Sequence, residues 1–551
     1  MAGVAPLVSY PFIDPSRADG RALWEWSAVG GPTVQASYRF DGLAAVGLAI
    51  GLLYVGAALI STTRVASRST ALRPALLLLG FVLITLTVTD DLVAVTVVLG
   101  ALAALTMFVA LLVSPPAAVA RVTAYLAAGV QAFIVAALLI TRTGGASFRF
   151  SEIAPTAVTP GVVLAAAIGA ALFAGLYPFV PWGYRQDESG ERESLRGLLT
   201  MPAGVGATIV LIRVVGTTRI DLSELRLPGS VSSGLLVIAA ILFLATLWRW
   251  SRARTMARAR PATITGAVFL ILILYPFLHW SHVVVLACLL TVAYAAAVSL
   301  ALPDQWPVTR YDVTLAAAWI GIAAGTPTAV AGALVVLLGG ALAALADAFW
   351  MPPHRAYIAM LASTTTIVAG ALAVGAGAFA SPDAVTAAIA TIAIIAVIAL
   401  ELVHVGRRLD VAAAPSDLEI TATLFAFLTT AIVAVLAGAP IIAALAGAFG
   451  RPSTVSLESI TLTAAACGVF AAMLAVVSGA LRPLLPDLAP LGTRLARTIA
   501  VADPVPVAAL AFRTLERSAT AVSTVFALFE ERAGVWLALV LIAGVVVWAV
   551  R

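Results

Sequence analysis

The sequence contains no lysine, few charged residues and only two cysteines. All 32 basic residues are arginines, and charged residues make up 11% of the 551 positions, whereas a soluble globular protein carries about 25%. So few charges cannot cover a soluble surface, which excludes a soluble enzyme, a nucleic-acid-binding protein and a disordered chain. Cys288 and Cys467 lie in apolar runs without the spacing of a metal site or a disulfide framework, and we expect both to be buried free thiols.

Apolar residues dominate what is present: they make up 62% of the chain, and the mean hydropathy is +1.07. At about 20 apolar residues per crossing, the chain is predicted to be an all-α polytopic membrane protein with about 14–16 transmembrane helices. The predicted spans are 42–61, 72–89, 92–113, 118–140, 161–180, 197–216, 232–249, 262–278, 283–302, 356–379, 384–404, 419–447, 456–480 and 534–550. The stretch 312–350, interrupted at Gly325-Thr326-Pro327, is interpreted as two helices or as one broken helix.

The predicted spans divide the chain into four parts. A non-spanning segment, 1–40, precedes a transmembrane bundle, 41–480. An amphipathic segment, 481–533, carries arginines among apolar residues and is expected to lie along the membrane surface. A final helix, 534–551, follows it. We interpret 481–533 mainly as a surface tether for the last span, with a strut gripping a neighbouring subunit as the alternative.

Arginine placement predicts the orientation, because cytoplasmic loops collect positive charge. The loops 61–73 and 249–260 are rich in arginine and fall on one side of the predicted topology. Two crossings within 312–350 also place Arg407 and Arg408 on that side, which favours the higher span count. The chain is therefore expected in a prokaryotic cytoplasmic membrane, with its N-terminus outside.

The centres of the predicted spans lack carboxylates, histidines and lysines. Ionisable groups in membrane spans are costly and usually functional, and an arginine stays charged and cannot relay a proton. Candidate ion-pathway residues therefore lie near span ends: His279 and His282, Glu401 and His404, and Asp90 and Asp91. For each pair we favour an ordinary structural role, as membrane-edge anchors or a short polar loop, over a proton or cation path. No metal, haem or other cofactor site is expected.

Several short motifs occur along the chain in an order that is typical of one family. The segment 38–61 resembles an early helix that begins with Asp-Gly-Leu, and Asp90-Asp91-Leu92 resembles an Asn-Asp-Leu helix start. The other matching segments are Tyr177–Trp182, Leu211-Ile212-Arg213, Gly325-Thr326-Pro327 and Glu530–Trp536. Together they resemble antiporter-like subunits of the superfamily that includes respiratory complex I, Mrp-type cation/proton antiporters and energy-converting hydrogenases.

The departures from this family pattern fall on its proton-channel residues. The place of a family glutamate is Gly100, and the places of two family lysines are Phe173 and Ala203. The resemblance thus implies the fold and the kind of complex, while these substitutions argue against proton pumping by this chain.

If the resemblance holds, the bundle contains two inverted five-helix repeats, with one helix break near 197–216 and another at Gly325 and Pro327. Our first hypothesis is a structural membrane subunit of a complex I-like or hydrogenase-like proton-translocating complex. Its partners would be other membrane subunits, the lipid bilayer and, indirectly, a peripheral redox arm that performs any NADH or hydrogen chemistry. The second is an active subunit with a rerouted path through His279, His282, Glu401 and His404. The third is an unrelated polytopic transporter or lipid-linked transferase.

Overall fold

The computed structural model describes ten stretches of the chain. They are 22–27, 33–65, 71–113, 116–143, 147–176, 190–218, 279–301, 306–348, 353–381 and 383–409, together with the single residues Pro6, Leu7, Arg517 and Thr520. The chain divides into two compact units, Met1–Ala502 and Asp503–Arg551, and all ten stretches belong to the first. The predicted spans 232–249, 262–278, 419–447, 456–480 and 534–550 lie outside the described residues, as does the segment 481–533 except for Arg517 and Thr520.

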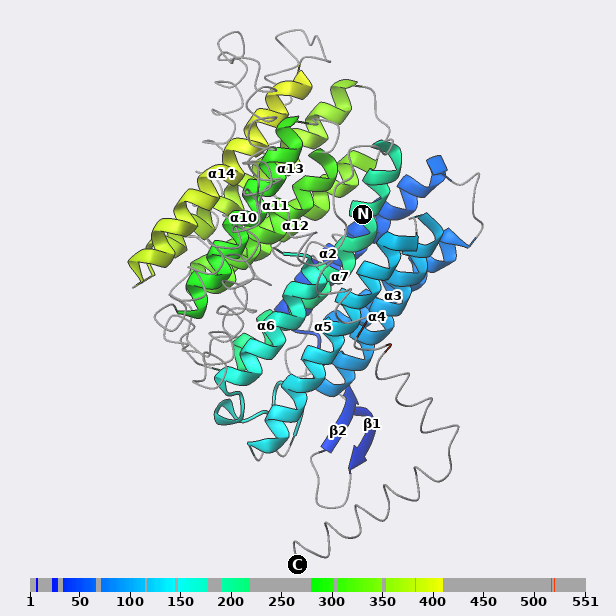
Figure 1. The fold of residues 1–551 in the computed structure, drawn as a ribbon, viewed down its shortest axis with the longest axis vertical. Helices are drawn as coiled ribbons and strands as arrows, with labels where there is room; N and C mark the ends of the chain where they lie inside the picture. Colours follow the sequence, from blue (N-terminus) through cyan, green and yellow to red (C-terminus); the bar gives the residue numbers. More distant parts are fainter. Residues whose placement is uncertain are drawn as a thin grey trace, which may run out of the picture. The chain divides into compact units, whose positions relative to one another are not determined.

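Eleven α-helices make up the described part of the bundle (Figure 1). They are α2 (Gly42–Val65), α3 (Leu72–Val88), α4 (Leu92–Val113), α5 (Pro116–Arg142), α6 (Pro160–Ala174), α7 (Gly190–Thr218), α10 (Trp280–Ala301), α11 (Trp306–Ala324), α12 (Pro327–Ala348), α13 (Pro353–Phe379) and α14 (Ala384–Leu409). Seven of them are long and apolar enough to cross a membrane. The prediction of an all-α polytopic membrane protein is confirmed, and the total of about 14–16 spans stays a prediction.

Most helices differ from their predicted spans by a few residues, and the differences at α6, α14 and α7 matter for the fold. α6 is shorter than 161–180 because Gly175, with a φ of 66°, adopts the left-handed conformation that ends helices. α14 extends beyond 384–404, because hydropathy stops at Arg407 and Arg408 while the helix continues to Leu409. α7 runs without a break through Pro202, so the helix break expected near 197–216 is not present in α7. A proline removes one helical hydrogen bond, and packing in a bundle can hold the helix together around it.

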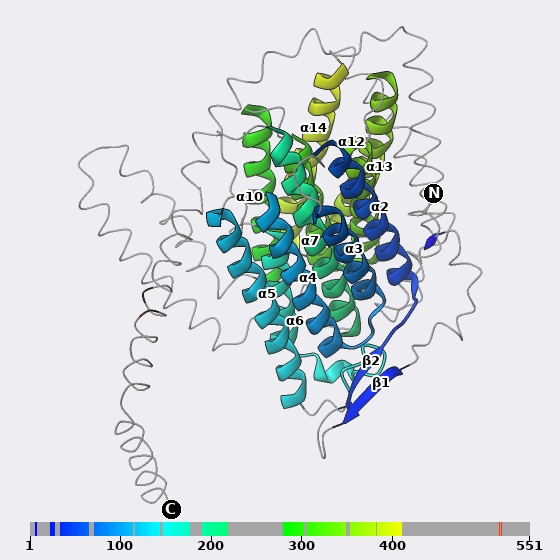
Figure 2. The ribbon, with the colours of Figure 1, turned by 90° about the vertical axis from the view of Figure 1, so that its right-hand side faces the viewer.

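A two-stranded hairpin, which the sequence analysis did not predict, lies in the segment expected to be non-spanning. β1 (Ala22–Ser27) pairs in antiparallel fashion with β2 (Thr33–Ser37), and a bulge falls between Ala22 and Trp24. Three contacts join β2 to the helix ends: the Tyr38–Thr89 bridge just after β2, a hydrogen bond from Gln35 to Asp91, and the Thr33–Ser147 bridge. The hairpin thus straps one end of the bundle, which we call the hairpin end (Figure 2).

The opposite end of the bundle is called the Trp306 end, because α11 begins there. α7 reaches the hairpin end, where Arg213 contacts Asp41 just before α2. α11 runs parallel to α7, since Trp319 bonds to Thr208 and Leu315 packs on Gly204. α11 therefore starts at the Trp306 end and finishes at the hairpin end.

α11, α12 and α13 pack in antiparallel succession. Gly325, with a φ of 68°, and Thr326 reverse the chain between α11 and α12, so 312–350 contains two helices. α12 and α13 approach closely enough for backbone contact: a Cβ atom at Gly332 would lie 2.6 Å from the Val374 nitrogen, and one at Gly370 would lie 2.7 Å from the Val336 nitrogen. Small residues at such a seam allow dense van der Waals packing where no hydrophobic effect drives helices together.

Candidate functional site

Arg310 of α11 and Glu401 of α14 form an ion pair inside the bundle. Nε of Arg310 donates to Oε1 of Glu401 at 2.9 Å, and Nη2 donates to Oε2 at 2.8 Å. Arg310 is 2% exposed and Glu401 is fully buried. Two parallel bonds of this kind fix the orientation of both groups as well as their separation.

Hydroxyl groups of α13 complete the surroundings of the pair. Nη2 of Arg310 also donates to the hydroxyl oxygens of Thr364 at 2.8 Å and Ser363 at 3.3 Å. The Thr364 hydroxyl in turn donates to Oε2 of Glu401 at 3.1 Å. The buried pair between α11 and α14 thereby forms hydrogen bonds with a third helix, α13, which offsets part of the cost of removing the two charges from water.

An aromatic layer lies next to the ion pair on the side of the Trp306 end. The rings of Trp306 and His404 stack with centroids 4.0 Å apart and an interplanar angle of 10°. Trp306 precedes Arg310 by one turn of α11, and His404 follows Glu401 by about one turn of α14. The stacked rings are buried, so the ion pair is covered from that end by this layer.

Glu401 lies deeper in its helix than the sequence analysis predicted. α14 continues to Leu409, about two turns beyond Glu401. The sequence analysis placed Glu401 about one turn from the span end and gave it no partner outside α14. Arg310, which precedes the predicted stretch 312–350, was not among the predicted site residues. The available signal was an arginine and an aspartate two residues apart, Arg310 and Asp312, next to a long apolar run.

His279 and His282 lie together at the hairpin end and meet a residue that was not predicted. The His282 ring bonds through Nε2 to Asp383, the residue before α14, and Nδ1 of His282 accepts the backbone N–H of His279 at 3.3 Å. Thr386 donates its hydroxyl to Asp383 at 2.5 Å. Burial raises the pKa of Asp383, but the hydrogen bonds from Thr386 and His282 outweigh it and hold that pKa below its ordinary value.

The pair His279 and His282 and the pair Glu401 and His404 lie near opposite ends of α14. His282 contacts Asp383 before the first residue of the helix, whereas Glu401 is 17 residues into it. At about 1.5 Å per residue, about 25 Å separates them along the helix axis. Any path between them would have to use other groups.

Asp90 and Asp91 are fully buried under the hairpin. Asp91 caps α4 by accepting the backbone N–H groups of Val93 at 2.8 Å and Ala94 at 2.9 Å. Asp90 accepts the Ser151 hydroxyl at 2.9 Å. Burial raises the pKa of both carboxyls above the ordinary value, although hydrogen bonds and nearby arginines act in the opposite direction.

Arg213 ties the end of α7 to two other helices at the same end. It donates to Oδ1 of Asp41 at 3.0 Å and to the Thr87 carbonyl at 2.9 Å. Arg213 is 6% exposed, so these bonds replace most of its contact with water. Arg213, Asp41, Asp90 and Asp91 thus all lie at the hairpin end.

Three positions were assigned, from the resemblance alone, to the places of proton-channel residues, and their surroundings are as follows. Phe173 is 4% exposed and packs edge-on against Phe133, and a Cβ atom at Gly129 would lie 2.7 Å from its ring. Ala203 is 1% exposed. Beside it, a Cβ atom at Gly204 would lie 3.0 Å from Cα of Ala174, so α6 and α7 are in close contact there. A Cβ atom at Gly100 would meet nothing within 4 Å.

Metal binding has no support in the described stretches, where no group of three His, Cys, Asp or Glu side chains is placed to hold an ion. Cys288 is a buried free thiol. The described part of the chain instead contains a buried ion pair between α11 and α14, and a network of carboxylates and arginines at the hairpin end.

Comparison with known proteins gives matches at the level of structure. No family profile matches the sequence, and no curated protein matches it. A chain of the Mrp complex from Dietzia sp. DQ12-45-1b matches with a TM-score of 0.58 and 16% sequence identity, over 100% of this chain and 60% of that one. A chain of respiratory complex I from Thermus thermophilus with bound NADH matches with a TM-score of 0.47 and 16% identity, over 86% of this chain and 92% of that one.

The Mrp match carries the structural conclusion. This chain spans 60% of the length of the Mrp chain, so the similarity concerns the shared helical part. At 16% identity it describes architecture and not activity. This chain therefore shares the helical fold of the matched chain of the Mrp complex.

Proposed function

We propose that this chain is a structural membrane subunit of a multisubunit, ion-translocating complex of the Mrp or respiratory complex I type. Its fold supports the kind of complex. Its role would be to seal and brace the membrane part of the assembly next to sister subunits that carry the translocation path. Redox chemistry, where the complex has any, would belong to a peripheral arm and not to this chain.

The contact between α6 and α7 is the observation that carries this proposal. Phe173 and Ala203 occupy the places of two family lysines, and both are buried in close-packed apolar surroundings. A lysine side chain at either position would need polar partners that these apolar surroundings do not offer, and at Ala203 it would also need additional volume. The apolar contact therefore argues against a proton path through this half of the bundle.

A second candidate is translocation through the other half of the bundle, and the Arg310–Glu401 pair favours it. A fully buried carboxylate inside a membrane bundle is a functional-site candidate by default. Against it, Arg310 is always charged and cannot pass a proton on. His279 and His282, which belonged to the same predicted path, are far from Glu401 along α14. The fold similarity favours these two candidates over an unrelated transporter or transferase.

The two candidates are separated by removing both charges together. In the complex purified in mild detergent and reconstituted into vesicles, Arg310→Met with Glu401→Leu replaces the pair by apolar groups, an exchange that is often tolerated. A structural role predicts normal assembly and an unchanged translocation rate per complex. A translocation path through Glu401 predicts normal assembly with loss of translocation, and that result would reject the structural role. Glu152→Gln, at an exposed site of the hairpin end, is the matched control.

The first step of this experiment identifies what copurifies with the chain by mass spectrometry. The proposal expects sister membrane subunits, including chains with lysines at the positions of Phe173 and Ala203. Recovery of the chain alone, or with cell-envelope enzymes, would reject both candidates.

A further inference from the structure

β1 is the outer strand of the hairpin and carries two exposed apolar side chains. β2 lies between β1 and the helix ends, because Gln35 and Thr33 of β2 contact Asp91 and Ser147. On β1, Leu23 is 76% exposed and Trp24 is 59% exposed. Leu23 lies in the bulge, which breaks the strict alternation of side chains and does not force the two onto opposite faces.

The exposed pair lies close to the hairpin end of α3. Trp24 pairs with Ala36, only two residues before Tyr38, and Tyr38 bridges to Thr89 directly after α3. Tyr38 is itself 41% exposed. At about 3.3 Å per residue along a strand, Trp24 is within about 10 Å of the level at which α3 ends.

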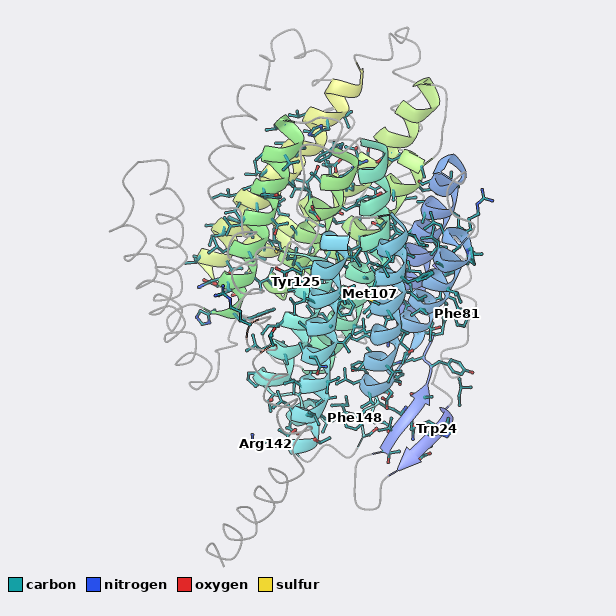
Figure 3. All side chains as sticks on the ribbon, turned by 45° about the vertical axis from the view of Figure 1, so that its right-hand side comes forward. Trp24, Phe81, Met107, Tyr125, Arg142 and Phe148 are labelled. Carbon is teal, nitrogen blue, oxygen red and sulfur yellow. The ribbon has the colours of Figure 1, made fainter. Side chains whose placement is uncertain are left out.

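The outer face of α3 carries exposed apolar side chains that lie about 10 Å or more from its hairpin end. Leu77, Leu78 and Phe81 are 55%, 53% and 66% exposed, as expected for side chains that meet lipid. Figure 3 shows Phe81 and Trp24 along the same edge of the molecule, with Trp24 beyond the helix. Leu23 and Trp24 thus lie beyond the end of a predicted membrane span, on the edge of the molecule that carries Phe81, and the next residue, Glu25, is charged and exposed.

We infer that β1 is a membrane-surface anchor, in which Leu23 and Trp24 insert into the boundary between lipid headgroups and acyl chains beside α3. Tryptophan and tyrosine favour this boundary because their rings combine an apolar body with a polar group. An anchored β1 holds β2 against the helix ends and so keeps the strap over Asp91 in place. The occupant of this surface is the bilayer itself, and no other protein is required.

The test places a nitroxide label at residue 24 of the full chain. Trp24→Cys is made with Cys288→Ala and Cys467→Ala, and the labelled protein is reconstituted in nanodiscs of phosphatidylcholine and phosphatidylglycerol. Power-saturation electron paramagnetic resonance compares access of oxygen, which enters lipid, with access of a water-soluble nickel complex. Phe81→Cys is the lipid-facing control, and Glu152→Cys, whose side chain is 46% exposed, is the aqueous control.

An oxygen-to-nickel ratio at residue 24 between the ratios of the two controls supports the anchor. A ratio equal to that at residue 152 means that Trp24 faces water and overturns it. Protection from both reagents means that protein covers the pair, as another part of the chain or a partner would, and also overturns it. Leu23→Cys repeats the measurement at the neighbouring position, so a poorly folded Trp24 variant does not leave the question open.

Discussion

Arg310 and Glu401 lie 91 residues apart in the sequence and are joined by two hydrogen bonds between α11 and α14. Glu401 alone would be a buried charge without compensation, and so would Arg310. We therefore expect either Glu401→Gln or Arg310→Met to lower the free energy of unfolding by about 3–5 kcal/mol. The measurement is reversible unfolding in mixed micelles.

The double variant, Arg310→Met with Glu401→Leu, is expected to recover most of that loss, because no uncompensated charge remains. If each single variant is as stable as the unaltered protein, the pair is not buried as described here.

The bond between Trp319 and Thr208 is expected to contribute modestly to the packing of α11 on α7. Nε1 of Trp319 donates to the Thr208 hydroxyl at 3.0 Å, and both residues are buried. Hydrogen bonds between membrane helices are worth about 0.6 kcal/mol on average and at most about 1.7. A double-mutant cycle with Trp319→Phe and Thr208→Val should give a coupling energy in that range, and a coupling of zero would contradict the bond.

Because α12 and α13 pack closely, we expect the addition of a single methyl group between them to destabilise the protein. Gly332→Ala would place a Cβ atom 2.6 Å from the backbone nitrogen of Val374. We expect this variant to lose about 1–3 kcal/mol, the usual cost of overpacking. Gly375→Ala is the matched control on α13, because its Cβ atom would meet Ile394 at an ordinary 3.4 Å. Equal stability of the two variants would argue against the close seam.

Because of Asp90, we expect the folded protein to lose stability as the pH rises. Burial raises its pKa in the folded protein, so the fold favours the protonated carboxyl. The stabilisation is complete below the ordinary aspartate pKa of about 3.9 and is lost as the pH rises through the raised pKa. Asp90→Asn should flatten this part of the stability profile, and a profile that is unchanged in this variant would assign the slope to other groups.

Because of Asp383, we expect the free energy of unfolding to change with pH in the opposite direction at lower pH. Its pKa is lowered in the folded protein, because hydrogen bonds from Thr386 and His282 outweigh burial. Its stabilisation is therefore present above the ordinary aspartate pKa and is lost as the pH falls through the lowered one. Unfolding at a series of pH values should show this loss in the unaltered protein and not in Asp383→Asn. Persistence of the acid limb in that variant would assign it to other carboxyls.

The orientation is predicted by the charges at the Trp306 end, where Arg64 and Arg73 lie near the loop between α2 and α3. The positive-inside rule assigns this end to the cytoplasm. In intact cells, a membrane-impermeant maleimide should label Glu152→Cys at the hairpin end and not Arg73→Cys. The reverse pattern would invert the topology.

The sequence predicted the helices well and the polar contacts poorly. Predicted spans such as 42–61 and 92–113 match α2 and α4 closely, because each is a long apolar run that must bond its own backbone inside a membrane. Apolar runs contain no information on which helix faces which. The partner of Glu401 was therefore missed, as was Asp383, the partner of His282.

Composition and hydropathy alone determined that this is a helical membrane protein, since a lysine-free chain with 11% charged residues has no other way to bury its apolar surface. Tertiary structure decided the rest. It paired Arg310 with Glu401, covered them with the Trp306–His404 layer and laid a hairpin over Asp91. Each contact joins segments distant in sequence, and the packing of whole helices, not the local pattern, fixes such distances.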